Sequence, residues 1–250
     1  MARPFLTIVI PAYNEAERLP LTLLAIDRHL SEAEYSSEIL VLNDGSTDAT
    51  GDIVLRMSRA IKNLKLIDTG SHSGKGSAVR KGMLLARGQI RLFLDADYST
   101  PLSDFEIMMP LLRAGAQVVI GSRSHAQSQL VVRQNFGRQV MGKLGNFAVQ
   151  ALFLPRVWDT QCGFKAFTEK AAEDIFEVSK TEGWAFDMEI LSLAKRLGYE
   201  IKETPVHWTN SPFSHVSYSA YLQTLQEAIK IRWRLSKFDA YYKPRERTFI

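Results

Sequence analysis

The sequence predicts an α/β protein in which helices cover both faces of a mostly parallel central sheet. Short apolar runs alternate with segments of helical apolar spacing throughout the first half of the chain. A chain of 250 residues with 46% hydrophobic and 23% charged residues can bury a full core as one or two domains. Such an alternation of strands and helices is typical of parallel sheets.

The expected elements follow one another without interruption as far as residue 120. Strands are expected over residues 5–10, 39–42, 64–67, 90–94 and 118–120. Helices are expected over residues 19–30, 53–57, 74–86 and 102–112, with Ser46 or Asp48 capping the second. Because parallel strands point the same way, the residues that follow them meet at one edge of the sheet, where ligands bind in such folds.

The segment RLFLDADYSTP, residues 91–101, is the centre of this arrangement. Its apolar residues form a short buried strand, and Asp95 and Asp97 follow where the strand opens into a turn. Two carboxylates separated by one small residue suit Mg²⁺ or Mn²⁺, because these hard cations take oxygen ligands and leave room for a substrate diphosphate. The alternative is a turn in which aspartates serve only local hydrogen bonding.

The other strand ends carry residues that suit the same ligand. The sequences PAYNE, NDGS, HSGKG and GSR follow the first, second, third and fifth strands. Together they supply an aromatic ring, carboxylates, glycines that admit a close backbone approach, and two cations, which match a nucleotide with a diphosphate. The dinucleotide fingerprint GxGxxG is missing after the first strand, and the chain has no GxxxxGK[ST] loop.

Composition limits the cellular setting. The net charge of +4 does not require a nucleic-acid partner, and the single Cys162 cannot form an internal disulfide, which fits a reducing compartment. The apolar run at residues 5–10 is too short to span a membrane, and no window reaches the roughly 18 apolar residues that a spanning helix needs. We therefore expect a cytoplasmic protein whose membrane contact is peripheral or through a membrane-anchoring partner.

Seven motifs in a fixed order resemble one known family. They read IVIPAYNEAERLP, ILVLNDGSTDAT, GKGSAVRKGMLLARG, LFLDADYSTP, VVIGSR, DTQCGFKAFT and WAFDMEIL. The chain resembles the family 2 glycosyltransferases of the polyprenyl-phosphate sugar synthase type over residues 5–235. Within that type it most resembles the dolichyl-phosphate β-glucosyltransferases, with the dolichyl-phosphate mannose synthases as near relatives.

This resemblance implies a GT-A fold and an inverting transfer from a nucleotide-diphosphate sugar to a polyprenyl or dolichyl phosphate. Residues 1–235 would form the GT-A domain, with a nucleotide-sugar half at 1–122 and an acceptor half at 123–235, followed by a basic tail at 236–250. DTQCGFK and WAFDMEIL favour UDP-glucose as the donor.

The resemblance also assigns roles to single residues. The nucleotide-sugar pocket would be lined by Pro11, Tyr13, Glu15, Asp44, Lys75 and Asp95. Asp95 and Asp97 would be the metal pair, with Asp97 the direct ligand, and the catalytic group would be Asp97, Asp159 and Arg123, the last beside the diphosphate. The acceptor or phosphate contacts would be Arg133, Arg138, Lys165 and His215, where either of the two arginines could serve the donor phosphate instead.

Three positions depart from the family pattern. Asn43-Asp44 replaces an aspartate pair, so the base contact depends on Asp44. Ser99 replaces a further amide ligand of the mannose synthases. Ser214-His215-Val216 replaces a Ser-Lys-Leu element, so that a phosphate contact there would depend on the charge of His215.

The chemistry leaves the role of Asp159 open. A phosphate monoester has a second pKa near ~6 and needs little help from a general base. Asp159 would then organise a cationic acceptor pocket or orient the metal shell, whereas a hydroxyl acceptor would need it as a base.

The alternatives to a glucosyltransferase that acts on a lipid phosphate are a transferase acting on a saccharide hydroxyl, a GDP-mannose-dependent enzyme, and a non-catalytic binding module. Nucleic-acid binding would need a basic, aromatic surface, which only the C-terminal stretch offers.

Two further segments carry expectations. In WAFDMEIL, Trp184, Phe186 and Met188 are expected in the core, while Asp187 and Glu189 stand out as polar residues among apolar neighbours. Residues 218–238 are expected to form an amphipathic helix that either packs on the domain or contacts anionic lipid. Its apolar stripe would be Tyr221, Leu222, Leu225, Ile229 and Trp233, and its cations Lys230, Arg232, Arg234 and Lys237.

Overall fold

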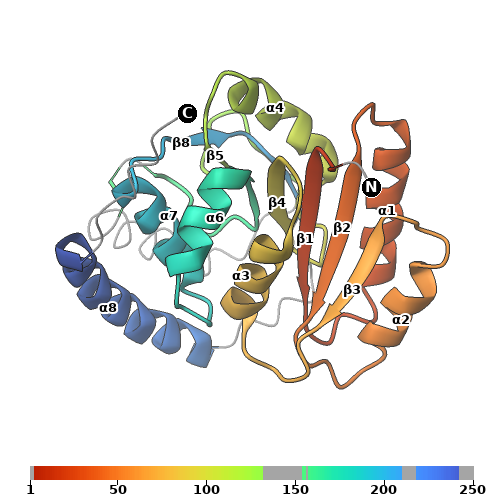
Figure 1. Cartoon of the computed structure of the whole chain (residues 1–250), viewed down its shortest axis with the longest axis horizontal. Helices are drawn as coiled ribbons and strands as arrows, with labels where there is room; N and C mark the ends of the chain where they lie inside the picture. Colours follow the sequence, from red (N-terminus) through yellow and green to blue (C-terminus); the bar gives the residue numbers. More distant parts are fainter. Residues whose placement is uncertain (1–2, 132–153, 156, 210–217, 242–250) are drawn as a thin grey trace.

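The computed structural model describes residues 3–131, 154–155, 157–209 and 218–241, and in the last helix the side chains of residues 226–237. In this part of the chain, a seven-stranded sheet has the order β3-β2-β1-β4-β7-β5-β8, and helices lie on both of its faces (Figure 1). All of its strands except β7 are parallel, which confirms the expected fold class.

The first half of the sheet matches the expected elements closely. Its strands are β1 (Leu6–Ala12), β2 (Ser37–Asn43), β3 (Leu64–Asp68) and β4 (Ile90–Leu94). The helices are α1 (Leu19–Glu32), α2 (Thr50–Met57), α3 (Lys75–Leu85) and α4 (Phe105–Arg113), the last preceded by the 3-10 turn η1 (Leu102–Asp104). Every residue of β1 and β4 is buried, as expected for strands covered on both faces.

The expected cap of α2 is wrong in detail. Ala49 occupies the N-cap position and makes no side-chain hydrogen bond. Asp48 instead accepts a hydrogen bond from the backbone N–H of Thr50 at 2.9 Å, and Ser46 accepts one from Asn14 at 3.0 Å. The polar residues after β2 therefore tie this loop to the loop after β1.

The second half contains a reversal that the sequence did not predict. β7 (Phe164–Thr168) lies antiparallel between β4 and β5 (Val118–Gly121), and β8 (Ile201–Thr204) then pairs parallel with β5. Leu94, the last residue of β4, faces Phe164, the first of β7. The residues before β7, not those after it, therefore reach the edge where the parallel strands end.

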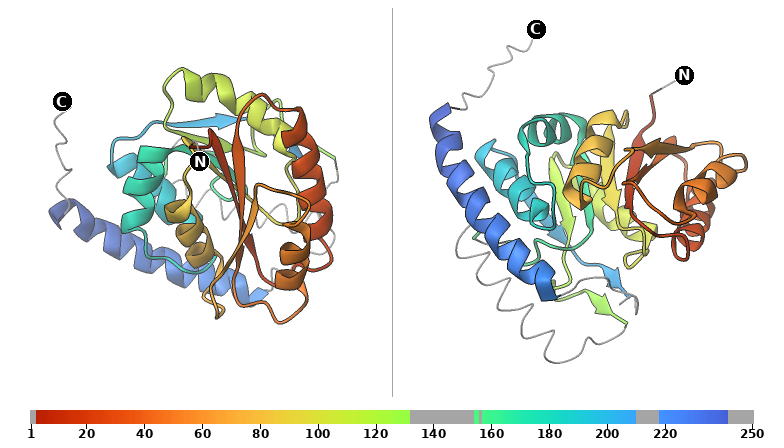
Figure 2. Two further views of the ribbon diagram at one scale, coloured as in Figure 1. Left: turned by 45° about the vertical axis from the view of Figure 1, so that its right-hand side comes forward. Right: turned by 90° about the horizontal axis from the view of Figure 1, so that it is seen from below.

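The helices of the second half are α6 (Glu169–Val178), α7 (Phe186–Arg196) and α8 (Tyr218–Tyr241), and β6 (Gln129–Leu130) pairs with β9 (His207–Trp208) in a separate ribbon. α8 runs along the outside of the molecule beside α7 in both views of Figure 2. No helix in the part of the chain that the structure describes is long and apolar enough to cross a membrane.

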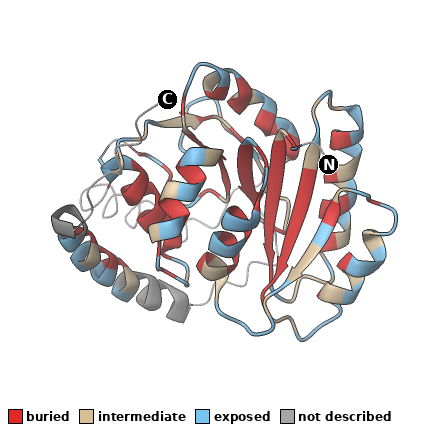
Figure 3. Cartoon of the chain, viewed as in Figure 1, coloured by how far each residue is buried: buried red, intermediate tan, exposed pale blue. Residues whose placement is uncertain are grey.

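Two apolar cores lie on opposite faces of the sheet. Neighbouring strand residues point to opposite faces, so Val9 packs with α3 and α7 while Ile8 and Ile10 pack with α1 and α4. Buried residues form continuous bands along the central strands and the inner sides of the helices (Figure 3). This two-sided packing fixes the strands and leaves the loops at their carboxyl ends to carry the site.

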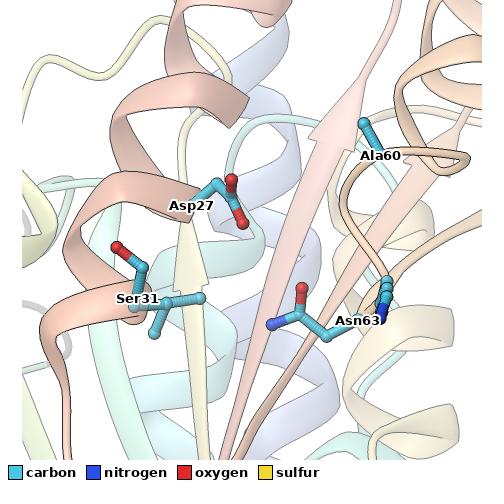
Figure 4. Close-up of a pocket in the computed structure, with 6 residues that line it drawn as sticks. Asp27, Ser31, Ala60 and Asn63 are labelled. Atoms are coloured by element: carbon cyan, nitrogen blue, oxygen red, sulfur yellow. The ribbon is translucent and has the colours of Figure 1, made fainter.

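A hollow of about 320 Å³ lies at the other edge of the sheet, where β3 begins (Figure 4). It is lined by Asp27, Leu30 and Ser31 of α1 and by Ala60, Lys62 and Asn63. Since it opens at the amino end of β3, it is separate from the strand ends that the sequence analysis singled out.

Candidate active site

The register of the strands places the candidate residues along one edge. Ala12, Asn43 and Asp68 lie in one row at the ends of β1, β2 and β3. β4 ends in the same direction, directly before Asp95. The loops after these strands therefore surround a common region, as the alternation of strands and helices predicted.

Asp95 and Asp97 occupy the centre of this edge. The backbone N–H of Asp95 donates to the Gly163 carbonyl at 3.2 Å, and its Oδ1 lies 2.6 Å from Nζ of Lys75. Tyr98 adopts a left-handed conformation with φ of 52°, and the N–H of Ser99 donates to Oδ1 of Asp97 at 3.0 Å. Both carboxylates are partly exposed, so each can present oxygen to a ligand.

Lys75, the first residue of α3, contributes a partly buried cation whose side chain is 20% exposed. Its Nζ lies 5.5 Å from the ring centre of Trp184 and 5.9 Å from that of Phe186. Burial by itself would lower the pKa of Lys75, but the nearby carboxylates, Asp95 foremost and then Asp187, outweigh it and raise the pKa. Lys75 therefore stays protonated beside Asp95.

The loop after β1 brings a second ion pair to the edge. Glu15 accepts hydrogen bonds from Nε and Nη2 of Arg18 at 2.7 and 2.5 Å. Nη1 of Arg18 lies 3.9 Å from Oδ2 of Asp97. Glu15 thus holds a guanidinium next to the carboxylate pair, while Pro11, another expected pocket residue of this segment, is a buried part of β1.

Asp44 shapes the loop after β3. Its carboxylate accepts hydrogen bonds from the N–H groups of Ser73 and Gly74 at 3.0 and 2.8 Å and lies 2.9 Å from Nδ1 of His72. The His72 ring stacks on Tyr13 with centroids 3.9 Å apart. Because the side chain of Asp44 is only 3% exposed, it holds this aromatic pair in place and does not itself face solvent.

Asp159 and Arg123, far apart in the sequence, form one buried ion pair. Nε and Nη2 of Arg123 donate to the two Asp159 carboxylate oxygens at 2.7 and 2.9 Å, and the Arg123 N–H donates to Oδ2 at 2.9 Å. Burial would raise the pKa of Asp159, but the Arg123 charge and hydrogen bonds lower it below its ordinary value. The Arg123 guanidinium lies 5.6 Å from the Trp208 ring centre.

The structure corrects the expected role of Lys165. Its side chain is fully buried, and its Nζ donates to Oδ1 of Asp187 at 2.6 Å and to the Cys162 carbonyl at 2.5 Å. A side chain enclosed in this way cannot reach an acceptor phosphate. Lys165 instead neutralises Asp187, whose pKa is raised because burial outweighs the two neighbouring lysines.

Other expectations divide. Phe186 and Met188 are buried as expected, whereas Trp184 is 41% exposed and therefore does not belong to the core. Arg133, Arg138 and His215 lie outside the described residues.

Three residues at this edge were missed. Arg18 follows Glu15 at the helical i,i+3 spacing, which could have indicated the pair. Glu203 of β8 accepts hydrogen bonds from the N–H groups of Trp158 and Asp159 at 3.1 and 3.0 Å, and no sequence signal links these positions. At Gly163 a Cβ atom would overlap the Asp95 carboxylate, so a larger residue there would displace that side chain. In the sequence, the position of Gly163 within DTQCGFK, between Asp159 and Lys165, was the signal that could have indicated a close approach.

The donor atoms fit a divalent cation that takes further ligands from a substrate. Within the described residues, no group of three or more His, Cys, Asp and Glu side chains could hold a metal by itself. Asp95 and Asp97 nevertheless supply hard oxygen atoms two positions apart, which is enough where diphosphate oxygens and water complete the shell. The sheet order and the loops at this edge are those of the GT-A fold.

Comparisons with known proteins agree. The family model described as "Glycosyl transferase family 2" matches residues 7–176, and the chain belongs to this family. It is 37% identical to a dolichyl-phosphate beta-glucosyltransferase of Dictyostelium discoideum, over 92% of this chain and 74% of the relative. It is 36% identical to the enzyme of that name in Drosophila melanogaster, over 82% of this chain and 67% of the relative.

A solved structure shares the fold. Glucosyl-3-phosphoglycerate synthase from Mycobacterium tuberculosis, in complex with Mn²⁺, uridine diphosphate and phosphoglyceric acid, superposes with a TM-score of 0.68 at 20% identity. The match covers 92% of this chain and 78% of that one.

Gly163→Ala tests the packing at the carboxylate pair. The added carbon would overlap Asp95 and force it away from Lys75, so we expect the rate of glycosyl transfer to fall roughly 100-fold. Gly51→Ala is the control, since its added carbon would meet only the Asn43 amide at 3.3 Å. Transfer rates and thermal unfolding would be measured for both variants, and wild-type transfer by Gly163→Ala would contradict the role of Gly163.

Proposed function

We propose that the protein transfers glucose, with inversion, from UDP-glucose to a polyprenyl or dolichyl phosphate, and that Mg²⁺ or Mn²⁺ is required. The relatives named above, matched over most of the chain, support glucosyl transfer to a lipid phosphate. Among structural observations, the buried Asp159–Arg123 ion pair carries the proposal furthest, because it bears on the kind of acceptor.

On the donor side, cations face the position where negative charge develops. As the anomeric bond breaks, the leaving diphosphate gains charge, and fixed positive groups stabilise the transition state. Lys75 and Arg18 are already oriented by Asp95 and Glu15, so they need little reorganisation. When bound at Asp97 and Asp95, the metal would supply further charge stabilisation as a Lewis acid.

On the acceptor side, the candidate general base is Asp159, and its carboxylate is already hydrogen-bonded to Arg123. Both oxygens of Asp159 accept hydrogen bonds from Arg123, and its pKa is lowered, so it is a poor proton acceptor at neutral pH. A hydroxyl nucleophile would need a better base, whereas a phosphate monoester is mostly dianionic already. This favours a phosphate acceptor, with Asp159 acting to orient Arg123.

A route to the lipid is offered by the outer face of α8. The helix packs on the domain through Ala228, Ile231 and Leu235, so the expected packing stripe at Ile229 and Trp233 is wrong for that purpose. Those two side chains are instead 66% and 62% exposed. We propose that this face binds a membrane surface peripherally, on its cytoplasmic side.

Some basic residues of α8 lie on its exposed face and one lies on the face that packs against the domain. Lys230, Arg232 and Lys237 are exposed, and Nζ of Lys237 lies 3.7 Å from the Trp233 ring centre. Arg234 instead faces inward and pairs with Glu189 at 2.9 Å. Exposed apolar side chains beside lysine and arginine are typical of helices at an anionic lipid surface.

The donor and acceptor are tested together by a panel. UDP-glucose, GDP-mannose and other nucleotide sugars would be offered with a polyprenyl phosphate and with a saccharide, and lipid-linked product would be followed by mass. We expect glucose to be transferred from UDP-glucose to the lipid phosphate. Preference for a guanine nucleotide, or product formed only on the saccharide hydroxyl, would overturn the proposal.

The metal requirement is tested at Asp97. Asp97→Asn removes a negative ligand, so we expect at least a roughly 100-fold loss of transfer, and excess chelator should stop the wild type until Mg²⁺ or Mn²⁺ is restored. Asp52→Asn, at an exposed position of α2, is the control for the same chemical change. Full turnover in excess chelator would refute the requirement.

Membrane binding is tested by changing Lys230, Arg232 and Lys237 together to Gln. Each cation near an anionic surface contributes about 1 kcal/mol, so the triple variant should bind anionic vesicles roughly 100-fold more weakly in sedimentation.

The control for this change removes three exposed cations elsewhere, Arg56, Arg59 and Lys62, to Gln. We expect that variant to sediment like the wild type. Equal sedimentation of the wild type with neutral and anionic vesicles, or no effect of the α8 substitutions, would point to a membrane-bound partner instead.

A further inference from the structure

The inner face of α8 is attached to the loop between α6 and α7. Nη2 of Arg234 lies 2.9 Å from Oε1 of Glu189 and donates to Oγ1 of Thr181 at 2.5 Å. The other oxygen of Glu189 accepts hydrogen bonds from the N–H groups of Lys180 and Thr181 at 2.9 and 2.6 Å. Because Glu189 is only 3% exposed, this is a buried, multiply bonded junction.

A second attachment holds the far end of the same loop. Oε2 of Glu227, also on α8, accepts a hydrogen bond from the N–H of Ala185 at 2.9 Å. The Glu227 carboxylate lies so close to Gly183 that a Cβ atom there would overlap it. α8 therefore fixes residues 180–185 at both ends.

This loop in turn supports the start of α3. The Glu182 carbonyl accepts hydrogen bonds from the N–H groups of Gly76 and Ser77 at 2.7 and 3.3 Å. Gly74 also packs against it, since a Cβ atom there would lie 2.6 Å from the Glu182 oxygen. Lys75 lies between these two glycines, so its backbone position is set by the loop.

The side chain of Lys75 depends on the same segment. Its Nζ lies 5.5 Å from the ring centre of Trp184, which belongs to the loop, and 5.9 Å from that of Phe186, which follows the loop. The same Nζ reaches Oδ1 of Asp95 at 2.6 Å. A continuous series of contacts thus runs from α8 through residues 180–185 to the carboxylate pair.

We propose that Arg234 and Glu227 are positioning residues for the donor site, which hold Lys75 against Asp95 through the loop at residues 180–185. The role in donor binding rests on the proposed function, because it takes Lys75 to face the donor diphosphate. The series of contacts from α8 to Lys75 does not depend on the proposed function. It makes the affinity for the nucleotide depend on how α8 is docked, although α8 carries none of the residues assigned to the nucleotide.

The connection is tested first without any ligand. Hydrogen exchange of the peptide that contains Gly76 and Ser77 would be followed by mass spectrometry in wild type, Arg234→Gln and Arg113→Gln. Arg113→Gln makes the same chemical change at an exposed position in the last turn of α4. We expect roughly tenfold faster exchange in Arg234→Gln alone, because loss of the junction frees the Glu182 carbonyl. Unchanged protection in Arg234→Gln would overturn the connection.

The effect on the donor site is tested by calorimetric titration with UDP in Mg²⁺. We expect Arg234→Gln to weaken UDP binding roughly tenfold, Arg234→Lys to restore part of it, and Arg113→Gln to match the wild type. In a Lys75→Met background, Arg234→Gln should cause no further loss, because its effect passes through Lys75.

Additive losses in that double variant would contradict the positioning role and leave Arg234 as a general stabiliser of the fold. The proposed function and the positioning role of Arg234 and Glu227 can be contradicted independently of each other. A wild type that binds no UDP would overturn the proposed function, while the exchange experiment would still decide whether α8 holds the start of α3.

Discussion

The ion pair between the buried Asp159 carboxylate and Arg123 is the interaction on which the second half of this sheet edge depends. Arg123 follows β5, and Asp159 precedes the reversed strand β7, so the pair forms only because β7 enters the sheet antiparallel. Glu203 of β8 holds the backbone of Asp159 from the other side. Three strands thus meet at one carboxylate, and the guanidinium it holds is fixed beside Trp208.

The same design recurs across the edge. Lys75 is paired with Asp95, Arg18 with Glu15, and Arg123 with Asp159. Each cation is oriented before a ligand arrives, which avoids the cost of ordering long side chains during the reaction. A donor diphosphate with its metal would meet fixed charges, not flexible ones. The site is therefore preorganised by carboxylates that need not touch the substrate themselves.

Much of the fold could be predicted from sequence because local pattern determines it. Apolar runs and helical spacing identified the strands and helices of the first half, and the parallel arrangement followed from their alternation. The reversal of β7 could not be predicted, since the pattern of FKAFT is the same in either direction. The pairing of Lys165 with Asp187, 22 positions apart, depends on tertiary packing and leaves no local pattern in the sequence. Lys165 was therefore expected to bind a phosphate, although it is buried.

The site shows a similar limit. The residues at the strand ends were identified correctly as neighbours, because a parallel sheet gathers them. What each side chain contacts depended on tertiary packing, as with Asp44, which holds a loop. In α8 the helical period allowed two apolar faces, and the helix buries Ala228, Ile231 and Leu235 instead of Ile229 and Trp233 of the expected stripe.

In the proposed reaction the acceptor phosphate needs no protein base, because both carboxylate oxygens of Asp159 are hydrogen-bonded to Arg123. The most direct test is the pH dependence of transfer to a polyprenyl phosphate in wild type and Asp159→Asn. The rate should rise through about pH 6 in both proteins, since that limb reports the second ionisation of the acceptor, with only its height reduced in the variant. If the rise in rate near pH 6 disappears or shifts in Asp159→Asn, Asp159 itself takes the proton, and the proposed reaction without a protein base is contradicted.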